Sequence, residues 1–340
     1  MSPSPAAIRE FPASDAAAIR REVFGAGEPR VLRGLVRDWP AVAAGRGSPA
    51  ALVQYLGRFD SGKPVDAIMT PPEALGRIFY NDTVTGFNFL RNRLPIAQVA
   101  EQVLRYSAFE RPPAVAAQSA LIAECLPGFT GENALALLDA RVQPRIWLGN
   151  AITTPTHLDE WNNIGCVVCG RRRFTLFPPG EIRNLYIGPL DFAPTGAPMS
   201  LVQLRAPDFT RFPKFREALG AAVTAELGPG DALYIPPLWW HHVESLEPVN
   251  MLVNYWWHAA GGPDIGVASG FDTLLHAILN LRTLAAPDRA AWAALFEYYV
   301  FGSQDGVTEH IPRERQGVLG ALSPEDIGRL RATLAQHLKT

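Results

Sequence analysis

Apolar and polar residues alternate in short runs from residue 145 to residue 257, a pattern typical of β-strands. Turn signals such as Phe177-Pro-Pro-Gly180 and Gly228-Pro-Gly-Asp231 separate the runs. An insertion at about residues 180–225 interrupts them, and its part Asp208–Leu219 is predicted as a helix. Many short strands of this kind predict an antiparallel barrel or jelly roll. The predicted strands are Arg145–Gly149, Thr156–Asp159, Ile164–Cys169, Arg173–Phe177, Ala232–Ile235, His241–Ser245 and Asn250–Trp257.

Helical periodicity appears on both sides of this β region. Upstream, an apolar stripe begins at Ile96 and precedes a predicted strand over Ala114–Ile122, which indicates an α/β segment over residues 1–144. Downstream, two apolar stripes and a Ser323 N-cap followed by proline predict a helical region over residues 259–340. The stripes are Ile96, Val99, Ala100, Val103 and Leu104; Phe271, Leu274, Leu275, Ile278 and Leu279; and Trp292, Leu295, Phe296, Tyr299 and Val300.

Composition places the 340-residue chain among folded proteins, with 48% hydrophobic and 19% charged residues. The formal net charge of −2 gives no global attraction to nucleic acid or to an anionic membrane, although a local basic patch stays open. No uncharged apolar run approaches the roughly 20 residues that span a bilayer. The first residues lack the basic and apolar regions of a signal peptide. We therefore expect a cytoplasmic protein that does not enter a membrane.

Three cysteines are too few for a disulfide framework. Cys166-Val-Val-Cys169 matches a metal or redox motif in spacing, but it lies in an apolar strand-like run. A spacing of three residues sends strand side chains to opposite faces. We expect ordinary buried cysteines.

Candidate chemistry lies in Thr154-Pro-Thr-His-Leu-Asp-Glu-Trp-Asn-Asn163. If His157 and Asp159 lie in one strand, their side chains point the same way. A later segment ends in Trp239-Trp-His-His242, and adjacent strand residues cannot both point inward, so it offers one further histidine. Two histidines and one carboxylate form the facial triad of non-haem Fe(II) oxygenases, which leaves three coordination positions open. The alternative is a set of satisfied polar groups within a barrel.

Three motifs in order carry a family resemblance: Thr-x-x-His-x-Asp-Glu, Gly-Arg-Arg-Arg-Phe-Thr-Leu-Phe-Pro-Pro, and Gly-Asp-Ala-Leu-Tyr-Ile-Pro-x-x-Trp-Trp-His-His-Val-Glu-Ser. Over about residues 145–257 the chain resembles the JmjC/cupin-like 2-oxoglutarate oxygenases, in particular the branch that contains the asparaginyl hydroxylase factor inhibiting HIF. The resemblance implies a mainly β fold, with a double-stranded β-helix (jelly-roll, cupin) core over 145–258. Residues 1–144 would complete the barrel.

The resemblance also implies a site. His157, Asp159 and His241 match the Fe(II) ligands, and Thr154, Asn163 and Asn254 match positions that line the 2-oxoglutarate pocket. Asn254 shares its strand face with Leu252 and Trp256. The cation for the distal carboxylate falls at Arg172, with Arg171 and Arg173 as alternatives, and a bidentate arginine can serve there.

One departure concerns the upstream strand, where the asparaginyl hydroxylase has a pocket tyrosine. The aligned stretch Val115-Ala-Ala-Gln118 has none, so either another hydroxyl serves or the pocket differs in shape. Among the clustered tryptophans, Trp161 is the candidate for substrate contact. We expect core packing for Trp239, Trp256 and Trp257.

The expected activity is that of a 2-oxoglutarate-dependent dioxygenase. Such an enzyme uses Fe(II), 2-oxoglutarate and O2, releases succinate and CO2, and most often hydroxylates its substrate. A protein side chain, a tRNA base or a small molecule could supply the C–H bond, and the net charge disfavours nucleic acid without excluding it. The rival from another class is a non-catalytic cupin-like ligand-binding protein. The C-terminal helices resemble dimerisation helices and imply a homodimer.

Overall fold

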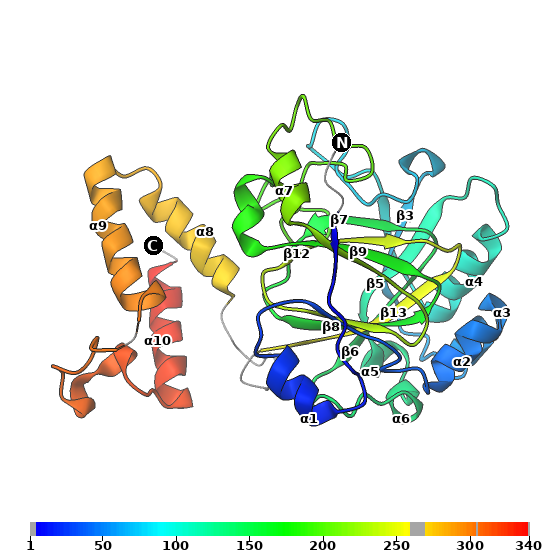
Figure 1. The fold of residues 1–340 in the computed structure, drawn as a ribbon, viewed down its shortest axis with the longest axis horizontal. Helices are drawn as coiled ribbons and strands as arrows, with labels where there is room; N and C mark the ends of the chain where they lie inside the picture. The colour runs from blue at the N-terminus through cyan, green and yellow to red at the C-terminus, as the bar shows by residue number, and fades with distance from the viewer. Residues whose placement is uncertain (1–4, 259–268, 304, 339–340) are drawn as a thin grey trace. The chain divides into compact units, whose positions relative to one another are not determined.

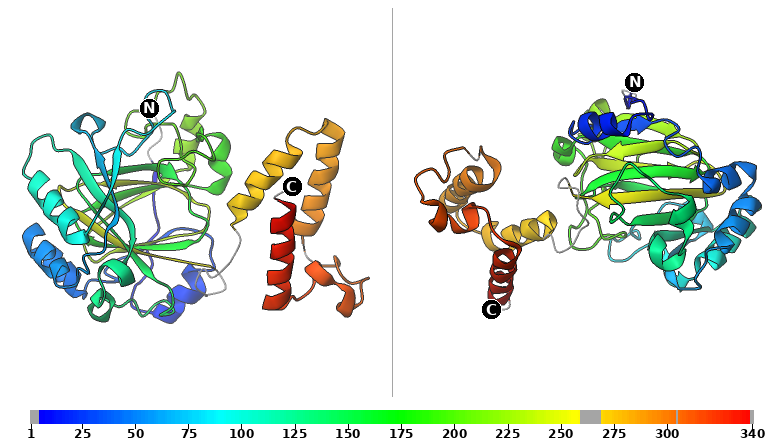
Figure 2. Two further views of the ribbon diagram at one scale, coloured as in Figure 1. Left: turned by 180° about the vertical axis from the view of Figure 1, so that it is seen from behind. Right: turned by 90° about the horizontal axis from the view of Figure 1, so that it is seen from below.

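The computed structural model describes residues 5–258, 269–303 and 305–338. The chain forms two compact units, residues 1–267 and residues 268–340, which Figures 1 and 2 draw in one colour gradient. Residues 259–268, with which the predicted C-terminal region begins, lie outside the described residues. Among the described helices, none has the length and hydropathy needed to cross a membrane.

Two β-sheets form the first unit (Figure 1). The smaller sheet has the order β1-β10-β9-β12-β7, and the larger one has the order β2-β11-β8-β13-β6-β5-β3-β4. Neighbouring strands are antiparallel except for β1 and β10. The strands are β1 Ala6–Ala7, β2 Arg30–Leu32, β3 Val65–Thr70, β4 Leu90–Leu94, β5 Ala114–Leu121, β6 Pro144–Gly149, β7 Thr153–His157, β8 Asn162–Cys169, β9 Arg172–Phe177, β10 Val223–Leu227, β11 Ala232–Ile235, β12 Trp240–Ser245 and β13 Asn250–Trp257.

The space between the sheets is filled by apolar side chains from both of them. Phe174 and Leu176 come from β9, while Val167 and Leu233 come from β8 and β11. Every residue of β8 is buried, which explains its nearly continuous apolar sequence. A jelly-roll core of the predicted kind is confirmed.

Helices cover the outer faces of both sheets. On the larger sheet, α2 packs against β8 and α4 packs against β5 and β6, over an extensive apolar core. On the smaller sheet, α7 contacts β9 and shares an apolar cluster with Phe177 and Trp240 (Figure 1). The α-helices are α1 Ala16–Ala18, α2 Pro40–Gly47, α3 Pro49–Gly57, α4 Ile96–Tyr106, α5 Ile122–Cys125, α6 Phe129–Glu132, α7 Phe215–Ala221, α8 Gly270–Leu281, α9 Ala286–Phe296 and α10 Pro324–His337.

Three local predictions need correction. The predicted strand Thr156–Asp159 is β7, which ends at His157, so Asp159 lies beyond it. The predicted helix Asp208–Leu219 is wrong in its first half: Asp208 caps a turn through the N–H groups of Thr210 and Arg211, and α7 begins at Phe215. The predicted strand Ile164–Cys169 is β8, which begins two residues earlier, at Asn162.

The cysteines of β8 are free and buried, as predicted. However, Cys166 and Cys169 pack into the same apolar core, so the prediction of opposite faces is wrong. The register shift in the β8–β13 pairing interrupts strict alternation between them. Burial raises the pKa of both thiols, which disfavours the thiolate that metal or redox chemistry needs.

The second unit contains the predicted C-terminal helices α8, α9 and α10. Ser323 caps α10 in a capping box with Asp326, as its sequence indicates. None of these three helices contains a buried residue, and Trp292, Leu295 and Leu334 are exposed.

Candidate metal centre and co-substrate pocket

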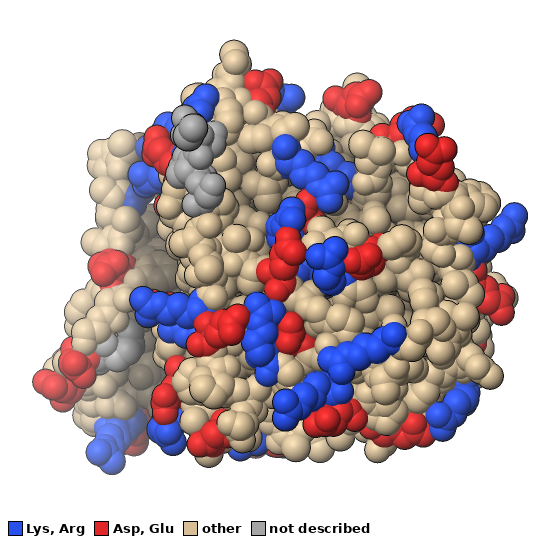
Figure 3. All heavy atoms as spheres, turned by 45° about the vertical axis from the view of Figure 1, so that its right-hand side comes forward, with Lys and Arg blue, Asp and Glu red and all other residues tan. Residues whose placement is uncertain are grey.

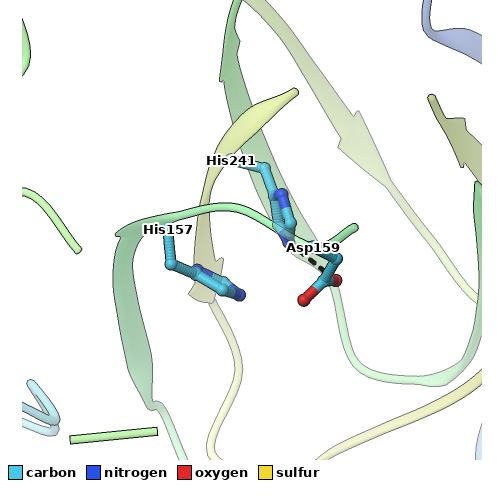
Figure 4. Close-up of side chains that lie close together, drawn as sticks. All are labelled: His157, Asp159 and His241. Carbon is cyan, nitrogen blue, oxygen red and sulfur yellow. Dashed lines mark ion pairs between the residues drawn. The ribbon is translucent and has the colours of Figure 1, made fainter. Parts of the chain in front are cut away.

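Strands β7 and β12 bring the two predicted histidine ligands together. In their antiparallel pairing His157 lies opposite His241, although the two residues are far apart in the sequence. Alternation along β12 turns His241 toward the space between the sheets, while Trp240 joins the cluster on the outer face. Figure 4 shows both rings pointing toward Asp159.

Asp159 reaches the same point from a loop. Beyond the end of β7, the carbonyl oxygen of Asp159 accepts a hydrogen bond of 2.8 Å from the N–H of Leu238. Leu238 has a φ of 63° and lies in the turn that leads into β12. The loop after β7 is thus tied to the loop before β12. This tie, rather than strand alternation, places the carboxylate beside the imidazoles.

The three side chains offer donor atoms at metal-binding separation. One ligand atom from each of His157, Asp159 and His241 lies within 4.8 Å of the others. His241 Nε2 is 3.5 Å from Asp159 Oδ2, and the two imidazole centroids are 4.1 Å apart. Two nitrogen donors and one oxygen donor without thiolate fit a non-haem Fe(II) site with open positions.

Backbone carbonyls orient both imidazoles. The oxygen of Pro155 lies 2.8 Å from His157 Nδ1, and the oxygen of Trp239 lies 3.0 Å from His241 Nδ1. A carbonyl can only accept, so each Nδ1 carries the proton and each Nε2 keeps its lone pair for a metal.

Local electrostatics keep His157 neutral. Burial and the neighbouring His241 lower its pKa to about 4. At pH 7 the ring is therefore neutral, with its one proton on Nδ1, as metal ligation through Nε2 requires.

A hydrogen-bonded chain orients the carboxylate of Asp159. Its Oδ2 accepts from Asn163 Nδ2 at 3.2 Å and from Trp256 Nε1 at 3.1 Å. Asn163 accepts in turn from Asn254, and Asn254 accepts from Trp147 Nε1 at 2.8 Å. Both predicted asparagines thus line the neighbouring cavity, and Asn163 contacts the candidate metal ligand directly while Asn254 contacts Asn163.

A cavity of about 160 Å³, here called the inner pocket, adjoins the three ligands. Thr154, Asn163, Arg172 and Asn254 line it, so the structure brings together every residue predicted for the co-substrate pocket. Apolar walls come from Phe174, Ile235 and Leu252.

Arg172 is the buried cation of the inner pocket. Only 8% of it is exposed, and its Nε has no hydrogen-bond partner among the described residues. Burial lowers its pKa to about 10, so it remains charged at pH 7. Its neighbours are committed elsewhere, because Arg171 pairs with Glu247 and Arg173 pairs with Glu226. A buried guanidinium with an unused donor fits an incoming carboxylate.

Sequence reasoning missed parts of the lining. Trp147 and Trp256 border the inner pocket, so the predicted core packing of Trp256 is wrong. Trp257 is buried as expected, and Trp239 packs partly buried against the core. The sequence did contain a signal for Trp256: it lies two residues after Asn254 in the same strand, so both side chains face the same side.

Trp161 is absent from the residues that line the inner pocket. Its Nε1 donates to His258 Nε2 at 2.8 Å, and its ring lies 6.2 Å from that of Trp256. Its contact with substrate stays a prediction.

Ser119 carries a hydroxyl and directly follows the stretch where the asparaginyl hydroxylase has its tyrosine. It lies at a bulge of β5, between Ala117 and Ala120, with a φ of 49°. The bulge points this part of β5 toward the inner pocket, which Ser119 lines.

A second cavity, here called the side pocket, has a volume of about 290 Å³ and shares Ser119, Trp147 and Thr195 with the inner pocket. Phe87 and Phe89 form part of its wall and stack with centroids 5.3 Å apart. Arg91 and Asp66, which are 3.4 Å apart, add opposite charges. The side pocket therefore adjoins the inner pocket at these shared residues.

Residues 16–262 match the family model described as a cupin-like domain. The chain belongs to this cupin-like family. JmjC-type members of the family use Fe(II), 2-oxoglutarate and O2, and the cluster of His157, Asp159 and His241 is a candidate site for the metal. The cluster and the family assignment together identify an oxygenase-type fold.

Three relatives illustrate the similarity of this cupin-like chain to characterised sequences. Human HSPB1-associated protein 1 is 37% identical over 131 residues, which cover 38% of this chain and 25% of that protein. Lysine-specific demethylase JMJ31 of Arabidopsis thaliana is 34% identical over 36% of this chain and 22% of its own length. Jumonji C domain-containing protein 5 of Drosophila melanogaster is 27% identical over 69% of this chain and 55% of its own. The matched part of the cupin-like chain thus spans about a quarter of the human relative.

Proposed function

We propose that this cupin-like protein is a Fe(II)- and 2-oxoglutarate-dependent hydroxylase. The observation that supports this most directly is the pairing of two features in one cavity. Three metal-binding donor atoms lie within 4.8 Å of one another, and the same cavity contains a buried arginine with an unused donor. A metal needs the first feature, and a dicarboxylate co-substrate needs the second.

Each residue has a proposed role in the reaction. His157, Asp159 and His241 would hold Fe(II), and Arg172 would bind the distal carboxylate of 2-oxoglutarate, with Thr154 beside it. Bound iron and 2-oxoglutarate supply oxidising chemistry: one atom of O2 enters a substrate C–H bond as hydroxyl, and the other enters succinate as CO2 leaves. Phe174 and Leu252 limit water access to the reacting centre.

Oriented ligands are this chain's main contribution. The carbonyls of Pro155 and Trp239 fix the imidazole tautomers, and Asn163 and Trp256 fix the carboxylate. Such outer contacts typically change metal affinity or activity by about 10- to 100-fold. The substrate would approach through the side pocket, past Ser119 and Trp147.

A protein side chain is the proposed substrate class, with tRNA bases and small molecules as alternatives. On the face in Figure 3, basic and acidic side chains are interspersed, an arrangement that does not favour docking of a phosphate backbone there. Two relatives are named lysine-specific demethylases, so methylated lysine peptides belong in the substrate screen.

The proposal is tested by succinate formation from 2-oxoglutarate, with added Fe(II), in extracts depleted of small molecules. The wild type should form succinate together with a product heavier by one oxygen atom, and Asp159→Ala should form neither. Equal succinate from both proteins would refute the assigned ligands. Tight binding of Fe(II) and 2-oxoglutarate without turnover of any substrate would favour the ligand-binding alternative.

We also propose that the second unit mediates homodimer formation. Helices of 11 to 14 residues are marginal alone, and α8–α10 bury none of their own residues within the described chain. A second copy of the chain could cover the exposed Leu295 and Trp292 of α9. Light scattering should give a dimer for the wild type and a monomer for Leu295→Glu, whereas a monomeric wild type would refute the proposal.

A further inference from the structure

A larger cavity lies on the opposite side of β12 from the candidate metal centre. Side chains alternate along this strand, so His242 points away from the inner pocket that His241 faces. The cavity has a volume of about 650 Å³ and is here called the outer pocket. The outer face of β7 and β12 forms its floor, and loop segments 71–84 and 201–212 contribute its walls.

Two buried polar groups in the outer pocket have no partner. His242 is 3% exposed, and both of its ring nitrogens lack a hydrogen bond within the described part of the chain. Arg77 Nη2 is also buried, and no described residue accepts a hydrogen bond from it. Buried polar groups in folded proteins are nearly always hydrogen-bonded, so an unused donor next to a cavity indicates a missing partner.

Four neighbouring polar side chains of the outer pocket already have partners within the chain. The Tyr80 hydroxyl donates to the carbonyl of Phe192, and Asn88 bonds the backbone of residues 77 and 79. Asp208 caps its own turn, and Arg205 pairs with the buried Glu244 of β12. Arg77 and His242 are therefore the lining residues whose buried polar atoms a ligand would satisfy.

The surroundings select the charge and shape of that ligand. The Arg77 guanidinium lies over the Phe79 ring, with Cζ 3.5 Å from the centroid, which leaves its edge for hydrogen bonding. Leu201, Leu204 and Phe212 add apolar wall. Glu73 and Asp82 also line the cavity, but both are exposed to solvent, whereas the unpartnered groups are a cation and an imidazole.

We propose that the outer pocket binds a small organic anion whose carboxylate or phosphate head contacts Arg77 and His242, with its apolar body against Phe79, Leu201 and Phe212. A guanidinium edge offers paired N–H donors that match either head group, and an imidazole N–H adds a third. This site is separate from the candidate metal centre and does not depend on the proposed hydroxylase activity.

Calorimetric titration of the full chain with benzoate, phenyl phosphate and inorganic phosphate tests the proposal. We expect saturable binding of benzoate or phenyl phosphate, and the tighter of the two identifies the head group. Inorganic phosphate should bind more weakly, because it lacks the apolar body. Failure of both organic probes to bind would overturn the proposal.

Matched arginine variants locate the binding. Arg77→Gln should weaken binding of the better probe by about tenfold or more, because it removes a charge-assisted hydrogen bond. Arg37→Gln changes an arginine exposed at the surface and should leave the affinity unchanged. Arg172→Gln should also leave it unchanged, whereas loss of binding in this variant alone would place the probe in the inner pocket and overturn the proposal.

His242→Gln supplies a second, independent readout. In the wild type with ¹⁵N-labelled histidine, the ring signals of His242 should shift on addition of the probe, and their assignment follows from their absence in His242→Gln. Unchanged ring signals at a saturating concentration of the probe would show that the probe does not contact His242 and would contradict the proposed site. Thermal unfolding of each variant without probe shows that it is folded.

Discussion

Two adjacent histidines of β12 lie on opposite faces of the strand and differ in their hydrogen bonding. His241 faces the inner pocket, where a backbone carbonyl fixes its ring and two candidate ligands lie nearby. His242 faces the outer pocket, where its two nitrogens have no partner among the described residues. Two identical residues that are adjacent in a strand therefore have unrelated surroundings, and strand alternation alone determines which pocket each side chain faces.

The largest expected effect is the difference in Fe(II) affinity between the variants His241→Ala and His242→Gln. His241→Ala removes one of three candidate ligands and should weaken Fe(II) binding by more than about 100-fold, beyond the range typical of outer contacts. His242→Gln should bind Fe(II) nearly as well as the wild type. Anaerobic titration followed by absorbance checks both values, and equal losses in the two variants would abolish the distinction between the faces.

The next effect concerns the cation of the inner pocket. Arg172→Gln should raise the dissociation constant of 2-oxoglutarate by about 10- to 100-fold, because a charge-assisted hydrogen bond is lost. Arg171→Gln is the control, since Arg171 is exposed and paired with Glu247. A larger loss in the control would transfer the role to Arg171.

A smaller effect is expected from the contact between Trp256 and Asp159. Trp256→Phe keeps the aromatic wall but removes the N–H that donates to Oδ2, so Fe(II) affinity should fall by about tenfold. Trp161→Phe should have no comparable effect, because Trp161 donates to His258 instead. If both variants bind iron like the wild type, the indole does not orient the carboxylate.

The smallest effect is on stability in acid. Burial, followed by Arg77, His157, Arg205 and His241, lowers the pKa of His242 to about 3 in the folded protein. Between the ordinary histidine pKa of about 6.5 and pH 3, the unfolded chain binds a proton here that the folded chain does not, so stability falls as pH falls. In the metal-free protein, the melting temperature of His242→Gln should decline less than that of the wild type from pH 7 to pH 4. Parallel declines would show that His242 does not contribute.

The fold and the candidate ligands could be predicted from the sequence because most of them lie in regular strands. Alternation and the spacing of turns are properties of local sequence, and they located β8, β12 and β13 to within a residue or two. Asp159 was predicted in the correct cluster, but the strand alternation used to place it does not apply, because Asp159 lies in a loop. The hydrogen bond from Leu238 that holds this loop is a contact between distant segments, which local sequence does not reveal. The outer pocket could not be predicted, since its walls come from irregular segments around Arg77 and Leu204.

The adjacency of the two histidines has a consequence for strand pairing during folding. If β12 slipped by one residue against β7 and β9, His242 would take the place of His241, and a metal would still find an imidazole. The histidines alone therefore do not discriminate between the two registers. Glu244 does, because the slip would move its carboxylate away from Arg205 and into the apolar interior. In this sense the ion pair of the buried Glu244 carboxylate, on the outer face, determines which histidine becomes the ligand on the inner face.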